Sequence, residues 1–170
     1  METAIVGIVG AFIGILLTNV LRVYFDWRNR RERVRDIQTA LQAEIRSHRE
    51  ALEEYEDAEF SNAIVNRLLT EGAYAPLITR KGDAQIFGAV VGDVHILPGN
   101  VIDPVVVYYR QWRSLGAFVE DLRSETFAAL PAARKVEAFR DYLDMGSYAI
   151  DLADNALAAI AGSLGTGRTD

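Results

Sequence analysis

Hydrophobic positions in this chain follow two patterns, one continuous and one periodic. The continuous pattern covers residues 4–21, a stretch of eighteen residues without charge in which only Thr18 and Asn19 are polar. Residues 22–25 (RVYF) lengthen this apolar run, with one arginine, to twenty-two residues. As a helix it would measure about 33 Å, enough to cross a hydrocarbon layer of about 30 Å. The pattern predicts that residues 1–25 form a transmembrane anchor.

Two other interpretations of this segment are a buried core helix and a cleaved signal peptide. Core helices are seldom apolar on every face over such a length. A signal peptide needs basic residues before the apolar stretch and a small-x-small cleavage site after it. Residues 1–3 carry no basic residue and residues 19–24 contain no such site. We therefore expect the anchor to be retained.

Small and polar residues recur along one side of the predicted span. They are Gly7, Gly10, Gly14 and Thr18, with Asn19 beside them. Such stripes let two helix backbones approach closely in lipid, and an asparagine can hydrogen-bond across the pair. The sequence predicts association of this helix with itself or with another membrane protein. The alternative is that glycine is simply common in membrane helices.

An arginine cluster follows the apolar segment directly. It consists of Arg22, Arg28, Arg30, Arg31, Arg33 and Arg35, and only Asp26 and Glu32 oppose it within residues 22–35. Arginines close to a span stay on the cytoplasmic side and are attracted to anionic lipid headgroups. Sixteen of the eighteen basic residues are arginine, which is typical of GC-rich bacterial genes. We expect a bacterial inner-membrane protein with its amino terminus outside, its bulk in the cytoplasm, and Tyr24, Phe25 and Trp27 at the interface.

The periodic pattern begins at residue 26 and predicts a long amphipathic helix over residues 26–57. Its apolar seam has steps of three and four residues and comprises Val34, Ile37, Leu41, Ile45, His48, Leu52 and Tyr55. No proline or glycine occurs from Arg22 to Phe60, so the predicted span can continue into this helix without a linker. The seam needs a partner, which is either a coiled coil or the domain downstream.

Residues 58–161 are predicted to form a helical bundle, followed by a flexible tail over residues 162–170. The expected helices cover about residues 59–70, 83–91, 103 to a break at Leu130-Pro131, and 132–160. Asp83 is the expected N-cap of the second, Asp103 with Pro104 the expected start of the third, and Pro98 an alternative start. Residues 73–81 are expected to be a loop with Leu77 among its buried side chains, and residues 93–100 a turn-rich connection.

The two longest of these helices, at the carboxyl-terminal end, are expected to form an antiparallel hairpin. Their seams are regular: Val105, Tyr108, Trp112, Leu115, Val119, Leu122 and Thr126 in one, and Val136, Phe139, Leu143, Gly146, Ile150, Ala153, Leu157 and Ile160 in the other. Gly116 and Gly146 are expected to allow close approach of the two helices. With no convincing strand pattern elsewhere, the predicted fold class is all-α.

Charge and composition restrict the function classes. The net charge is −6, yet residues 22–35 carry a net positive charge, so the rest of the chain is strongly acidic. An acidic domain disfavours a nucleic-acid partner. The chain has no cysteine, which excludes disulfides and thiolate metal sites.

Catalytic chemistry has little support in the sequence. Glu44 and His48 are one helical turn apart and could share a metal ion, and His95 with Asp93 could complete such a site. Helical di-metal sites use Glu-x-x-His pairs from two helices, however, and the chain has none. A hydrogen-bonded, half-buried His48 is the simpler interpretation. We expect no catalytic residue, no metal and no cofactor.

Taken together, the patterns predict a single-pass membrane protein whose cytoplasmic helical bundle binds another protein, as adaptor, scaffold or accessory subunit. Its expected partners are membrane lipid and another protein, which includes a second copy of this chain. The alternative is a signalling or stress-response element that transmits a change through a continuous helix over residues 22–56. A metal-dependent enzyme using Glu44 and His48 is the third hypothesis.

Overall fold

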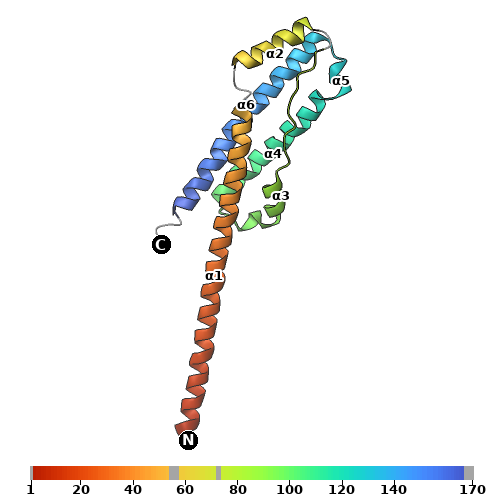
Figure 1. Ribbon diagram of the computed structural model, residues 1–170. Coiled ribbons are helices and arrows are strands. Elements are labelled where there is room, and N and C mark those ends of the chain that lie inside the picture. Colours follow the sequence, from red (N-terminus) through yellow and green to blue (C-terminus); the bar gives the residue numbers. More distant parts are fainter. Residues whose placement is uncertain (1, 54–57, 72–73, 167–170) are drawn as a thin grey trace. The chain divides into compact units, whose positions relative to one another are not determined.

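The fold is all-α, as predicted, and contains no strand in the residues that the structure describes. A computed structural model describes the backbone of residues 2–53, 58–71 and 74–166, and the side chains of residues 22–53, 58–71 and 74–165. Its elements are α1 (Glu2–Glu53), α2 (Ala58–Thr70), α3 (Gln85–Val90), the 3-10 helix η1 (Val91–Ile96), α4 (Gly99–Leu122), α5 (Glu125–Ala128) and α6 (Ala132–Thr166) (Figure 1).

The chain divides into two units, Met1–Ile37 and Gln38–Asp170, with the boundary inside α1. The first unit is the amino-terminal part of α1. The second is the bundle, which contains the remainder of α1 and all the other helices. Each unit is described by itself below.

Helices α4 and α6 form the centre of the bundle. They pack side by side and run in opposite directions, and α2 packs on α6 (Figure 1). The predicted seam of α4 is buried from Val105 to Leu122, whereas Thr126 is exposed. In α6, five residues of the predicted seam are buried, but three are only half-buried, namely Leu143, Gly146 and Leu157. Tyr142, Ala149 and Ala156, which the predicted seam left out, are buried. The 3.5-residue period therefore identified the core-facing side of α4, and that of α6 only in part.

The glycines of these two helices do not bring the backbones together. A methyl group built on Gly116 or Gly146 would meet no heavy atom of the described residues within 4 Å. The prediction of close approach at these positions is therefore wrong. Among the largest side chains that these two helices bury completely are Tyr108, Phe139 and Tyr142.

Several boundaries differ from the predicted ones because tertiary contacts decide them. Helix α4 begins at Gly99 with Pro98 as its N-cap, so Pro104 lies inside the helix and the alternative start is the observed one. Residues predicted to be a turn-rich connection form most of η1. Helix α6 ends at Thr166 and not near Ile160, and the Ser163 hydroxyl accepts a hydrogen bond from Gln38 Nε2 at 2.9 Å. The remainder of the predicted tail, residues 167–170, lies outside the described residues.

The extended segment 74–84 is held along α4 by side chains of that helix. Arg123 Nη1 donates to the carbonyl of Ile78 at 2.6 Å, and Trp112 Nε1 donates to the carbonyl of Gly82 at 3.0 Å. Ile78 is buried, as expected, but Leu77 is 92% exposed, contrary to prediction. The segment is therefore fixed by hydrogen bonds to its backbone and by two buried side chains, those of Pro76 and Ile78.

Candidate functional site

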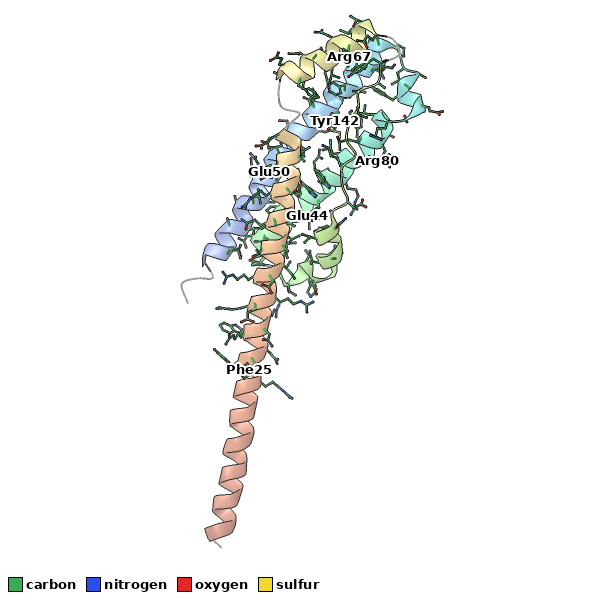
Figure 2. The ribbon with its side chains drawn as sticks, in the orientation of Figure 1. Phe25, Glu44, Glu50, Arg67, Arg80 and Tyr142 are labelled. Carbon is green, nitrogen blue, oxygen red and sulfur yellow. The ribbon has the colours of Figure 1, made fainter. Side chains whose placement is uncertain are left out.

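Large apolar side chains are exposed on the first unit, at the carboxyl-terminal end of the predicted anchor. The exposed fractions of Val23, Tyr24, Phe25 and Trp27 lie between 50% and 69%. Figure 2 labels Phe25 on this part of α1. Four consecutive or near-consecutive exposed residues of this size are unusual on a surface that faces water alone. Three of them, Tyr24, Phe25 and Trp27, are the residues predicted to lie at a membrane interface.

The arginines of the cluster flank these aromatic side chains along the helix, because Arg22 precedes them and the other five follow. All six, from Arg22 to Arg35, are exposed. The guanidinium of Arg31 lies 3.8 Å from the ring centroid of Trp27, a cation–π contact. Arg28 Nε lies 3.0 Å from Glu32 Oε1, and this hydrogen bond is the main reason that the pKa of Arg28 is raised. We call residues 22–35 the collar.

The span that precedes the collar lies outside the residues whose side chains are described. This applies to all five residues of the predicted association stripe, Gly7, Gly10, Gly14, Thr18 and Asn19. Among the described residues, no helix combines the length and the apolar composition that crossing a membrane requires. The predicted anchor and its association stripe therefore stay predictions.

Glu44 is a buried polar group of the bundle whose carboxylate accepts three hydrogen bonds. Its side chain extends from α1, where Figure 2 labels it, towards α3 and α4. The carboxylate accepts the backbone N–H groups of Ile86 at 2.7 Å and Phe87 at 3.0 Å, and the hydroxyl of Tyr109 at 2.6 Å. Backbone N–H groups in the first turn of a helix lack intrahelical partners, so Glu44 supplies the cap of α3 from another helix.

This arrangement corrects the prediction that Asp83 caps the helix. The N-cap position of α3 is Ala84, which makes no side-chain capping bond, and Asp83 is exposed. A cap contributed across 42 residues of sequence leaves no local signal. What the sequence does show is that Glu44 lies three residues after Leu41 and four before His48, on the buried side of α1.

His48 lies one turn further along α1, within an aromatic cluster. Its ring stacks on Trp112 with centroids 3.8 Å apart and an interplanar angle of 3°, and its Nδ1 lies 3.0 Å from the hydroxyl oxygen of Tyr108. Burial lowers the pKa of His48; the charge of Glu44 opposes this change and that of Lys81 adds to it. Burial also raises the pKa values of both Tyr108 and Tyr109. These groups stay neutral around pH 7, as a packed core requires.

The same contacts bear on the metal hypothesis. Both carboxylate oxygens of Glu44 accept hydrogen bonds from the protein, and His48 Nδ1 is paired with Tyr108. His95 Nδ1 lies 2.9 Å from the carbonyl oxygen of Gly92, at an exposed site. Within the described residues no three histidine, aspartate or glutamate side chains are grouped as metal ligands. The geometry thus gives Glu44 and His48 structural roles.

The buried seam of α1 packs within its own bundle. Leu41 and Ile45 are fully buried, and Leu52 nearly so. Beside the seam, Arg49 forms two hydrogen bonds with Asp154 of α6, at 2.6 and 3.3 Å, and another with Glu53. Of the two partners that the sequence allowed for this seam, the downstream domain is the one observed for the residues after Ile37, so the coiled-coil alternative is wrong there.

One open pocket of about 500 Å³ lies beside this cluster, between residues 81–84, α3 and α4. Phe87, Tyr109 and Trp112 contribute to its lining, but each is at least 91% buried, so little aromatic surface faces the pocket. Its lining includes two positively charged side chains, Lys81 and Arg113, and two negatively charged ones, Asp83 and Glu120. The mixed charges select no single class of ligand.

Comparisons with known proteins give no relative: no family model matches the chain, and no curated protein or solved structure gives a significant match.

Proposed function

We propose that this protein is a single-pass membrane protein whose helical bundle serves as a protein-interaction module at the cytoplasmic face of the bacterial inner membrane. The observation that carries the proposal is the collar. Its exposed aromatic side chains and six arginines directly follow eighteen uncharged residues. Aromatic belts followed by clustered arginines mark the cytoplasmic end of a membrane span.

The interior of the bundle supports a structural role for its polar groups. Glu44 caps α3, His48 is stacked and hydrogen-bonded, and Arg49 connects α1 to α6. Each of these side chains, which would otherwise be candidates for chemistry, is occupied by contacts that hold helices together. A rigid helical module of this kind presents surfaces to partners, as an adaptor, scaffold or accessory subunit does.

The mechanism that follows is confinement. A module tethered to the membrane meets other membrane-bound proteins at a high effective concentration, so that a weak contact is sufficient for association. The predicted stripe of Gly7, Gly10, Gly14, Thr18 and Asn19 would add lateral contacts between spans. No nucleic acid or cofactor enters this proposal.

Site-specific photo-crosslinking in intact cells tests the module. A benzophenone amino acid placed at Leu77 or Tyr148, both exposed apolar positions, should give a discrete adduct with another protein, or with a second copy. The adduct should weaken when residues 1–21 are deleted, because confinement is lost. The same amino acid at exposed Asp151 is the control for random collision. Absence of any protein adduct from both apolar positions would contradict the module.

A second candidate is a signalling element, favoured by the position of Glu44. The helix that contains the predicted span and the collar is the one that caps α3 and bonds to Tyr109. A shift of α1 would therefore break these bonds. A cysteine at Val34 or Arg30 should report symmetric disulfide crosslinks between copies if the element works as a dimer. Failure to crosslink at both positions would count against it.

A further inference from the structure

The arginine side chains of the collar surround the helix and do not share one face. At about 100° per residue, and with Arg22 at 0°, Arg30 lies at about 80°, Arg31 at about 180° and Arg28 at about 240°. The aromatic side chains lie within about half of the circumference, with Trp27 near 140°, Tyr24 near 200° and Phe25 near 300°. The arginines therefore point to all sides of the helix, whereas the aromatic rings cover about one half of it.

Along the axis, five of the six arginines follow the aromatic side chains, and Arg22 lies two residues before Tyr24, within reach of the interface because a long arginine side chain can snorkel. Tyr24, Phe25 and Trp27 occupy about 4.5 Å of helix, and Arg28, Arg30 and Arg31 follow within about 6 Å of Trp27. The polar layer of a bilayer is about 5–8 Å thick on each side. Aromatic rings at its inner edge would thus place these guanidinium groups among the lipid phosphates.

The charge balance of the collar is positive despite its acidic members. Glu32 lies 3.0 Å from Arg28, so one negative charge is already paired within the helix. Arg31 stacks on Trp27, which keeps its guanidinium next to the aromatic rings. Arg22 and Arg30 are exposed on two other sides of the helix. The groups available to an outside partner are therefore predominantly cations.

We propose that the collar binds the phosphates of anionic phospholipids, and that its partner is an anionic membrane surface that encloses the helix. This inference rests on the proposed anchoring of residues 1–25. A protein partner would contact one face and leave the opposite arginines unused, whereas a lipid layer supplies phosphates on all sides. Guanidinium groups bind phosphate through paired, charge-assisted hydrogen bonds.

Lipid-selective quenching of Trp27 tests this proposal on the full chain. The protein is reconstituted in nanodiscs that contain phosphatidylcholine and phosphatidylglycerol, with bromine on the acyl chains of either one, at equal mole fractions. The other tryptophan, Trp112, is 5% exposed and stacked on His48 within the bundle, so quenching reports Trp27. A Trp27→Phe variant gives the background. Brominated phosphatidylglycerol should quench more strongly than brominated phosphatidylcholine.

The variant Arg22→Gln, Arg30→Gln should lose most of this preference while its quenching by brominated phosphatidylcholine is retained. Each arginine at a membrane surface is worth up to about fivefold in lipid partitioning. The matched control, Arg110→Gln with Arg113→Gln, removes two exposed arginines of α4 and should keep the wild-type preference.

The outcomes separate this proposal from the one on which it rests. Equal quenching by the two brominated lipids would overturn lipid selectivity and leave the anchor intact. An unchanged preference in the Arg22, Arg30 variant would overturn the role of the arginines. Quenching by neither lipid would overturn the anchor itself, and this proposal with it.

Discussion

The hydroxyl of Tyr109 donates to Glu44 Oε2 at 2.6 Å, and the same carboxylate oxygen accepts the N–H of Phe87 at 3.0 Å. The rings of Phe87 and Tyr109 stack with their centroids 4.0 Å apart. One side chain of α1 therefore fixes both the start of α3 and the α4 residue on which α3 packs. Buried carboxylates with several donors are expensive to disturb, because each donor then loses its partner without access to water.

We expect Glu44→Gln to lower the free energy of unfolding by about 1.5–3 kcal/mol, the range for hydrogen bonds to a charged group. The amide has one acceptor oxygen in place of two and turns an NH₂ group towards the backbone donors. Urea unfolding of the full chain in mild detergent measures the change. Glu50→Gln, on the exposed side of the same helix, is the control and should change little. Equal effects of the two substitutions would contradict the capping role.

Stability should decrease on acidification through His48. Burial lowers the pKa of its imidazole below the ordinary value of 6.5, so between the two pKa values the unfolded chain binds more protons than the folded one. The free energy of unfolding then falls as the pH drops below about 6.5. The charged and titratable groups around this ring include those of Glu44, Lys81, Tyr108 and Tyr109.

Unfolding between pH 8 and pH 5 measures this effect as the difference between the wild type and His48→Gln. The variant should be less stable at pH 8 and show a flatter pH dependence. His95→Gln, at an exposed site in η1, should retain the slope of the wild type. A His48→Gln slope as steep as that of the wild type would show that other groups cause the loss.

The open space beside two helical glycines predicts gains in stability. Because a methyl group at Gly116 or Gly146 meets no described heavy atom within 4 Å, each change to alanine should raise the free energy of unfolding by about 0.5–1 kcal/mol. The reverse change at exposed Ala117, the neighbour of Gly116 in α4, should lower it by a similar amount. A loss of stability at either glycine would show that the helices approach closely there after all.

The ion pair between Arg49 and Asp154 should contribute modestly. Its two hydrogen bonds connect α1 with α6, but both side chains are partly exposed, at 28% and 53%. Asp154→Asn should therefore cost about 0.5 kcal/mol, and less at high salt, because solvent and ions screen the pair. Asp151→Asn, an exposed position in the same helix, is the control. A salt-independent cost at Asp154 would point to packing and not to charge.

How far the sequence predicts this fold depends on whether each feature is local. The apolar seam of α4 is a local feature, because steps of three and four residues place Val105 to Leu122 on one side of the helix whatever they contact. The start of α4 is less clearly defined by local sequence, because both Pro98 and Pro104 fit the first turn of a helix. The capping of α3 by Glu44 is not a local feature, because Glu44 lies far from α3 in the sequence. Local rules instead name Asp83, which is close to the start of α3, as the N-cap.

For the candidate site, the sequence predicts the exposed collar but not what the bundle does with Glu44 and His48. The spacing of these two residues is compatible with a shared metal, and only the positions of Tyr108, Tyr109 and the α3 backbone show that their polar atoms are already bonded. Those partners lie 42 to 65 residues away in sequence. Pairing over such distances depends on the packing of the helices, which periodicity does not specify.

Protease treatment of spheroplasts tests the central claim, that residues 1–25 anchor the bundle on the cytoplasmic side. The full chain with a carboxyl-terminal epitope is expressed in a bacterium, and membranes are washed with alkaline carbonate to remove peripheral proteins. We predict that the epitope stays with the washed membranes, survives protease added outside, and is digested once the spheroplasts are lysed. Recovery of the epitope in the soluble fraction, or its digestion in intact spheroplasts, would contradict the account.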